Sequence, residues 1–135
     1  MTDNPVSLAK SLTPIFSQYP DIQAAYLFGS AAAGRRRDDS DLDLALVPRS
    51  NALRQQKLDI LTDLAQAGFD NVDILILDTN DIVVQYEAVR YNWVIYHTTD
   101  FEPATFYSNV ARKYLDFLPF LQVQRQAYKR RILNG

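Results

Sequence analysis

The spacing of hydrophobic and polar residues along the chain predicts strands separated by helices. Residues 22–28 (IQAAYLF) form a short apolar run typical of a buried strand, and residues 72–77 (VDILIL) form the most hydrophobic run in the sequence. Residues 41–47 alternate polar and apolar positions before Pro48, and residues 93–96 (WVIY) form another short apolar segment. We therefore predict four strands.

Helices are predicted between and around these strands. Apolar residues recur every three or four positions in residues 6–18, although Pro14 is unfavourable inside a helix. We predict a short helical turn over residues 31–33, ending at Gly34, and longer helices that begin at Asn51 and Asn80, with Gly68 as the end of the first.

A last helical stretch follows the fourth predicted strand. We expect Asp100 to cap it, Pro103 to lie in its first turn and Pro119 to kink or divide it. Strands that alternate with helices and are followed by helix predict an α/β or α+β fold, a mixed β-sheet flanked by helices with a C-terminal helix.

Composition and charge narrow the class of protein. The 135 residues are 47% hydrophobic with a net charge of -2, which is typical of one folded domain and offers no basic excess for long nucleic acid. Residues 112–135 are nevertheless basic, which suits an acidic partner, a nucleic acid or a solvated helix end. No cysteine, signal peptide or membrane-spanning run is present, so we expect a cytoplasmic protein.

Carboxylates inside predicted strands are the strongest chemical signal. Asp41 and Asp43 are two positions apart in a strand, so their side chains point to the same face, about 6.6 Å apart along it. Their repulsion calls for a cation, and oxygen ligands suit Mg²⁺ or Mn²⁺. Asp73 lies between Val72 and Ile74, where a carboxylate is either at a sheet edge or has a partner. If the two strands are neighbours, the three carboxylates share one site for one or two metal ions.

The pair Gly29-Ser30 follows the first predicted strand. Where a strand turns into a helix, free backbone N–H groups beside a hydroxyl can cradle a phosphate, although a simple tight turn has the same sequence. Together with the aspartates, the pair indicates a triphosphate with its metal, and attack on phosphorus with pyrophosphate leaving.

The spacing of these residues resembles a known superfamily. Gly29-Ser30, ten further residues, Asp41-x-Asp43 and a later Asp73 are similar to the nucleotidyltransferases related to DNA polymerase β. The short chain and the string GSAAAGRRRDDSDLDLAL resemble the minimal nucleotidyltransferases within it, which are often encoded beside a HEPN-domain ribonuclease toxin. The resemblance implies a polymerase β-like fold, with one domain over residues 1–135, a core at about 20–98 and a helical extension at about 101–133.

The resemblance also implies a function. Asp41 and Asp43 would bind catalytic Mg²⁺, Asp73 would bind metal and help activate the attacking hydroxyl, and Gly29 and Ser30 would hold the triphosphate. The expected activity is that of an antitoxin that transfers AMP from ATP to a tyrosine of its HEPN toxin. Two alternatives stay open: nucleotide transfer to a small molecule, and an antitoxin that neutralises its partner by binding alone.

Other candidates have ordinary structural explanations beside the functional ones. In the loop of Arg35, Arg36 and Arg37 we assign Arg37 to a phosphate, the alternative being a solvated loop balanced by nearby aspartates. Ser40 is a nucleotide-site candidate that otherwise ends the loop. The single histidine, His97, has no second histidine to form a metal site with it. Tyr86, Tyr91 and Trp93 are expected to seal the sheet rather than stack on a base.

Overall fold

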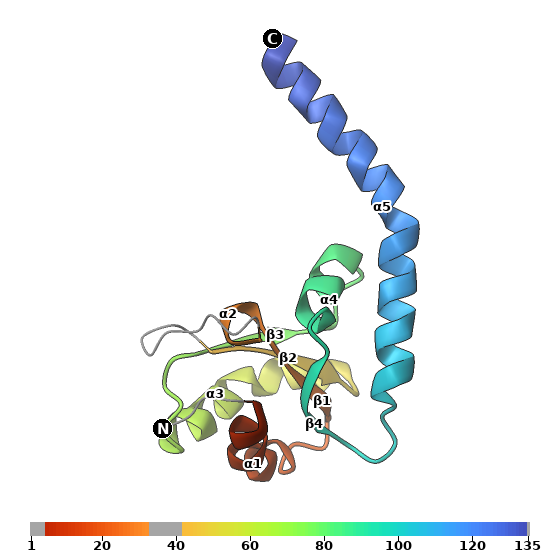
Figure 1. Cartoon of the computed structure of the whole chain (residues 1–135). Helices are drawn as coiled ribbons and strands as arrows, with labels where there is room; N and C mark the ends of the chain where they lie inside the picture. Colours follow the sequence, from red (N-terminus) through yellow and green to blue (C-terminus); the bar gives the residue numbers. More distant parts are fainter. Residues whose placement is uncertain (1–4, 33–41, 135) are drawn as a thin grey trace.

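The computed structural model describes residues 5–32 and 42–134, which form a mixed four-stranded sheet flanked by helices (Figure 1). The strands are β1 (Ile22–Phe28), β2 (Leu42–Pro48), β3 (Val72–Ile76) and β4 (Trp93–His97). They lie in the order β3-β2-β1-β4. Strand β2 is parallel to β3 and antiparallel to β1, and β1 is antiparallel to β4. All four strands fall where the hydrophobic pattern predicts them.

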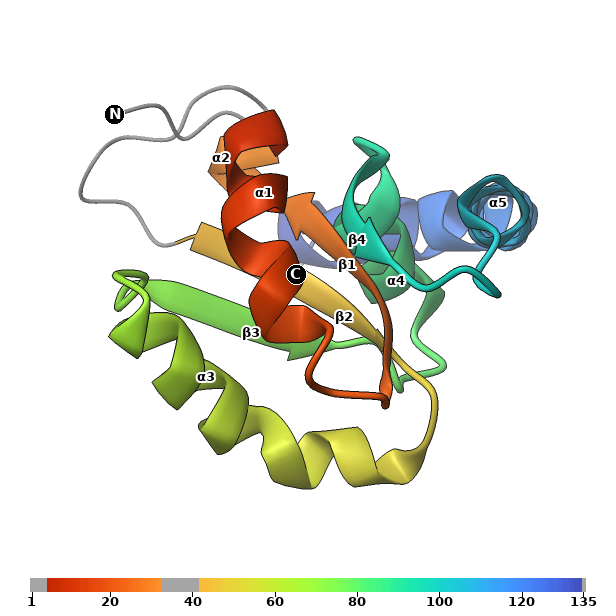
Figure 2. The same ribbon diagram turned by 90° about the horizontal axis from the view of Figure 1, so that it is seen from below.

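One face of the sheet is covered by α1 (Pro5–Phe16), α3 (Lys57–Gln66) and the 3₁₀ helix η1 (Asn51–Gln56), as Figure 2 shows. Leu12 and Phe16 of α1 and Ile60 of α3 are fully buried there against alternate residues of β1 and β2. Pro14 lies in the last turn of α1 and does not end the helix. This apolar layer fixes β2 in a register that sends its remaining side chains to the opposite face.

The opposite face of the sheet packs against α4 (Ile82–Val89) and the first part of α5 (Pro103–Asn134). Val89 of α4 and Val110 of α5 are buried against Tyr26 of β1 and Val47 of β2. Tyr86 of α4 and Tyr114 of α5 stack with ring centroids 4.0 Å apart. These helices cover only part of the face and leave the end of the sheet near α2 (Gly29–Ala32) to the candidate site.

Three predicted helix starts are wrong by one or a few residues. Ser50, rather than Asn51, caps the segment that follows, and its first six residues are 3₁₀ rather than α-helix. Asp81, rather than Asn80, caps α4 and accepts hydrogen bonds from two backbone N–H groups. The short helix α2 begins at Gly29, directly after β1, and not at Ala31. Neighbouring residues with similar capping oxygens make such starts ambiguous in a sequence.

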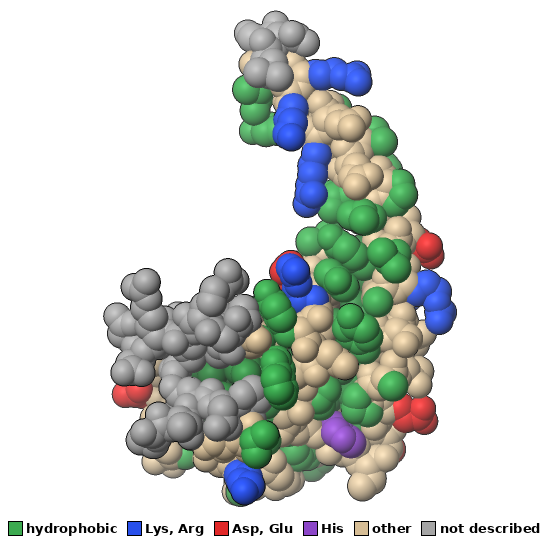
Figure 3. Space-filling view, viewed as in Figure 1, with side chains coloured by type: hydrophobic (Ala, Val, Ile, Leu, Met, Phe, Trp, Pro, Cys, Tyr) green, Lys and Arg blue, Asp and Glu red, His purple; other side chains and the backbone are tan. Residues whose placement is uncertain are grey.

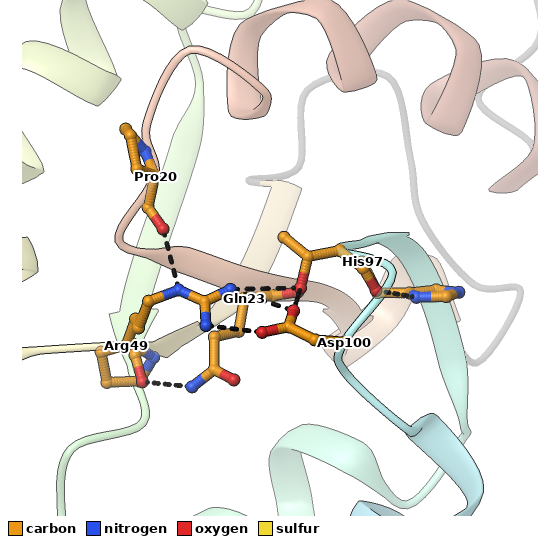
Figure 4. A network of polar contacts seen from close by, with 7 residues as sticks. Pro20, Gln23, Arg49, His97 and Asp100 are labelled. Carbon is orange, nitrogen blue, oxygen red and sulfur yellow. Dashed lines mark hydrogen bonds and ion pairs between the residues drawn. The ribbon is translucent and has the colours of Figure 1, made fainter.

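The base of α5 is held by a polar network at the far end of the sheet from α2 (Figure 4). Arg49 donates hydrogen bonds of 2.8 and 3.1 Å to the two carboxylate oxygens of Asp100 and one of 3.2 Å to the carbonyl oxygen of Pro20. Hydrogen bonds from Arg49 and Thr98 lower the pKa of Asp100. Asp100 is therefore an ion-pair partner and not the predicted helix cap.

Helix α5 continues through Pro119 without dividing, and Figure 1 shows it bending midway along its length. The prediction of a kink is confirmed, because proline removes one backbone hydrogen bond while its neighbours keep theirs. In the described part of the chain, no helix has the length and hydrophobicity needed to cross a bilayer.

Candidate active site

Two of the three predicted carboxylates meet at one end of the sheet. Asp43 of β2 and Asp73 of β3 are direct partners in the parallel register. Partners on neighbouring strands are about 4.8 Å apart and point to the same face. Both side chains therefore lie on the face opposite α1 and α3, since Leu44 and Ile74, the next residue of each strand, are buried in the layer beneath those helices.

Gly29 is held against one of these carboxylates. It follows Phe28, the register partner of Asp43, and has a positive φ of +71°. A Cβ atom at Gly29 would lie only 2.2 Å from Oδ2 of Asp43 and 3.1 Å from its Cγ. Glycine is needed here both for its backbone conformation and for the space that the carboxylate occupies.

The burial of the two aspartates differs in a way that suits a site at a sheet edge. Asp43 lies on an inner strand and is half-buried, whereas Asp73 lies on β3, at the edge of the sheet, and is exposed. The sequence predicts that Asp73 either lies at a sheet edge or has a partner, and its position on the edge strand β3 agrees with the first alternative. One carboxylate is positioned by packing and the other is open to solvent and to a ligand.

The remaining predicted site residues are less completely described. Ser30 follows Gly29 in α2, so its backbone lies at the same end of the sheet. Asp41, Arg37 and Ser40 lie outside the described residues, as do Arg35 and Arg36. Within the ranges 5–32 and 42–134, no group of three acidic or histidine residues has the arrangement of a metal site.

Asp43 and Asp73 nevertheless fit a divalent cation of the kind that the sequence predicts. They bring two hard, anionic oxygen donors to neighbouring strands, and Mg²⁺ is commonly bound by one or two carboxylates together with substrate phosphates. Two carboxylates in direct register repel each other unless a positive charge is nearby. The donor set thus agrees with the predicted magnesium chemistry.

Other candidate residues lie away from this end of the sheet. His97 pairs with Ala24 at the opposite end of β1, is exposed, and its Nδ1 lies 2.8 Å from the carbonyl oxygen of Thr98. Tyr91 and Trp93 do not seal the sheet as expected, because 37% and 41% of their surfaces are exposed. Both lie where the chain enters β4, an edge strand, where less protein covers them.

A surface pocket also lies away from the carboxylates. It has a volume of ≈ 350 Å³ and is lined by residues that include Gln23, Val47, Asp100 and Phe106. Gln23 and Val47 are at the far end of β1 and β2 from Asp43, so this pocket is separate from the candidate site. The Arg49–Asp100 network beside it was missed by the sequence analysis, since nothing in the local pattern links two residues 51 positions apart.

Comparisons with known proteins identify the family of this chain. Residues 10–101 match the family described as "Polymerase beta, Nucleotidyltransferase". No curated protein matches the sequence.

Solved structures of toxin–antitoxin complexes contain chains of similar fold. A complex with AMP-PNP has a chain 23% identical to this one, with 96% of this chain and 98% of that chain covered and a TM-score of 0.65. A mutant MntA–HpeT complex has a chain 22% identical, with coverage of 96% and 98% and a TM-score of 0.67. A complex of a tri-AMPylated Shewanella oneidensis HEPN toxin with MNT antitoxin has a chain 22% identical, with both coverages 96% and a TM-score of 0.59.

The family match and the fold lead to one conclusion. The match spans more than half of the chain and includes Gly29, Asp43 and Asp73. At this level of identity the solved structures add a shared fold along nearly the whole length. This chain belongs to the polymerase β family of nucleotidyltransferases.

Proposed function

We propose that this chain is an adenylyltransferase that moves AMP from ATP to a tyrosine of a HEPN toxin and thereby neutralises the toxin. The observation that carries the proposal is the register pair Asp43–Asp73 in a nucleotidyltransferase fold, with the Asp43 carboxylate in the space that a Cβ atom at Gly29 would take. A chain that acted by contact alone would have no need for two carboxylates in direct register at the end of its sheet.

The structures of similar fold support this substrate and acceptor. One is a toxin–antitoxin complex with the ATP analogue AMP-PNP, and another contains a HEPN toxin that carries three AMP groups. The MntA–HpeT complex is a variant with two aspartates, two positions apart, replaced by glutamate. Asp41 and Asp43 have the same spacing in this chain.

The proposed reaction is a displacement at the α-phosphorus of ATP in which the carboxylates take part. The tyrosine oxygen attacks the α-phosphorus of ATP, the new O–P bond forms as the bond to the β-phosphate oxygen breaks, and pyrophosphate leaves. We assign Asp73, the exposed carboxylate, to the side of the attacking hydroxyl, where it accepts the proton. When bound, Mg²⁺ would neutralise charge on the triphosphate and on the leaving pyrophosphate.

The other proposed roles concern binding of the nucleotide. Asp41, Asp43 and Asp73 are assigned to hold the metal ions, and the backbone at Gly29 and Ser30 to approach the triphosphate. Gly29 suits this role because it has no side chain to block the approach. Arg37 and Ser40 are assigned to the phosphates on their sequence position alone.

The proposed unit spans residues 1–135. We assign catalysis to a core over about residues 20–98 and the contact with the acceptor to the helical extension over about residues 101–133. Since the reaction consumes ATP and silences a ribonuclease, we place it in the cytoplasm.

The test is transfer of label from α-labelled ATP in the presence of Mg²⁺. The acceptors are the product of the neighbouring gene, which we expect to be a HEPN protein, and, separately, a small-molecule pool and RNA. We expect label on the HEPN protein, released as a tyrosine adduct after digestion, and none after chelation of the metal.

Matched variants separate catalysis from contact. Asp43→Asn and Asp73→Asn should each lower the transfer rate at least about 100-fold, the usual size of such losses when charge stabilisation or a general base is removed. Asp59→Asn is the control, because Asp59 is an exposed carboxylate of α3, which covers the face of the sheet opposite Asp43 and Asp73. Label on the small molecules or RNA alone, or equal transfer by all variants, would overturn the proposal.

A further inference from the structure

The distal half of α5, defined here as residues 117–132, is a largely exposed helix that combines large apolar side chains with basic ones. Every residue from 122 to 132 is exposed. The exposed side chains include large hydrophobic ones: Phe120 (55%), Val123 (63%), Tyr128 (63%) and Ile132 (61%). Isolated helices of this length are marginal in water, and exposed apolar patches of this kind mark interaction sites.

These hydrophobic residues cover one half of the helix circumference. With about 100° of rotation per residue, Val123, Phe120, Tyr128 and Ile132 follow one another around an arc of about 180°. Gln122 and Gln126 fall in the opposite half and are also exposed. The proximal part of α5 uses its apolar residues inside the fold, where Val110 is buried and Tyr114 stacks on Tyr86, but the distal half has no such support from the described residues.

The charge of the distal half points to an acidic partner. It contains the four basic residues Arg125, Lys129, Arg130 and Arg131 and no acidic one. A surface that receives this helix would therefore combine apolar side chains with carboxylates. A second copy of the helix would be repelled, since it has the same charge.

The direction of the helix relates this surface to the candidate site. After the bend near Pro119, the distal half leans back over the face of the sheet that packs against α4 (Figures 1 and 2). This is the face to which Asp43 and Asp73 point. Figure 3 shows an open hollow between the distal half and the body, bordered along the helix by hydrophobic and basic side chains.

We propose that the distal half of α5 is the docking surface for the acceptor protein, which receives it on a surface that combines apolar and acidic residues. A protein held there would lie beside the hollow and face the Asp43–Asp73 end of the sheet. The proposal rests on the proposed function, because it identifies the bound partner with the protein that accepts AMP. Docking on α5 would supply the positioning of the tyrosine that a small core lacks by itself.

The experiment measures binding separately from transfer. The full chain, in an Asp43→Asn background and without ATP, is titrated with the HEPN protein encoded beside it. The double variant Phe120→Asp/Val123→Asp is compared with the matched control Gln122→Asp/Gln126→Asp, which adds the same charge to the opposite side of the same helix. To check folding, both double variants are also made in the chain that keeps Asp43, and their circular dichroism and Mg²⁺–ATP binding are measured.

We expect the Phe120→Asp/Val123→Asp variant to bind the HEPN protein at least about 30-fold more weakly, the size of effect found at interface hot spots. The control should stay within about threefold, and added salt should weaken binding by the parent chain. Three results would overturn the proposal: equal losses in both variants, no measurable binding by the parent, or a self-associating chain whose dimer the first variant dissolves. Because no transfer is measured, a failure of docking and a failure of catalysis give different results.

Discussion

At Gly29 a backbone requirement and a chemical one coincide. The residue has a positive φ, and the carboxylate of Asp43 occupies the space of a β-carbon. Gly68 is a natural comparison, because it also has a positive φ, of +100°, but a β-carbon there would meet nothing within 4 Å. The two glycines thus separate backbone strain from displacement of the aspartate.

We predict that Gly29→Ala and Gly68→Ala both lower the free energy of unfolding by about 1–2 kcal/mol, since alanine is strained in this region of φ. Only Gly29→Ala should also abolish AMP transfer and weaken Mg²⁺–ATP binding, because it pushes the Asp43 carboxylate away. Urea unfolding and label transfer measure the two effects. Normal transfer by a folded Gly29→Ala variant would show that the contact with Asp43 has no part in catalysis.

Tyr26 gives a second prediction at the scale of one residue. Its ring is fully buried near Phe106, and its hydroxyl has no hydrogen-bond partner among the described residues. Burial raises the pKa of Tyr26 to about 12, against 10.0 for a free tyrosine. The unfolded chain therefore ionises first, and the folded state loses stability as the pH rises from about 10 to 12.

We expect the Tyr26→Phe variant to be at least as stable as the parent at pH 8, because it removes an unpaired buried hydroxyl. Between pH 10 and 12 the variant should gain on the order of 2 kcal/mol relative to the parent. The pKa of Tyr19 is also raised to about 12, chiefly by burial, but this contribution is present in both proteins and cancels. Denaturant unfolding at several pH values measures the difference, and parallel curves for the two proteins would contradict the account.

Among the elements, α4 shows how a helix start is chosen. The carboxylate of Asp81 accepts hydrogen bonds of 3.0 and 3.3 Å from the N–H groups of Val83 and Val84. We predict that Asp81→Ala lowers the free energy of unfolding by about 1 kcal/mol, whereas Asn80→Ala changes it little. Thermal or urea unfolding of the two variants is the measurement, and equal losses would mean that the cap is shared between both residues.

The predicted and observed elements differ in how far local sequence signals determine them. The four strands were predicted because their apolar runs are bounded by turn residues, and those signals are local. The cap of α4 was misplaced by one residue because Asn80 and Asp81 both have suitable oxygens. The ion pair between Arg49 and Asp100 was not predicted, because it depends on where β2 and β4 end in space.

Some features of the candidate site could likewise be predicted from the sequence, and others could not. The meeting of Asp43 and Asp73 was expected if the two strands were neighbours, and the parallel register confirms that they are. The close fit of Asp43 against Gly29 depends on the register of β1 with β2 and had no signal in the sequence. The bend of α5 was predicted from Pro119, but its direction over the sheet depends on the packing of the whole molecule.

At the scale of the whole molecule, the carboxylate pair of the sheet and the long helix α5 have complementary roles. The sheet supplies a pair of carboxylates at an open end, and the long helix extends beyond the body with apolar and basic side chains. In our account the first transfers the nucleotide and the second holds the protein that receives it. If so, neutralisation of the partner leaves AMP covalently bound to it.

The most direct test is the intact mass of the HEPN partner after co-expression with this chain. With the wild-type chain, and with the control Asp59→Asn, we predict a partner whose mass is increased by one or more AMP groups on tyrosine. With Asp43→Asn the partner should keep its unmodified mass. A partner that is bound and silenced by the wild-type chain at its unmodified mass would contradict the account and establish neutralisation by contact.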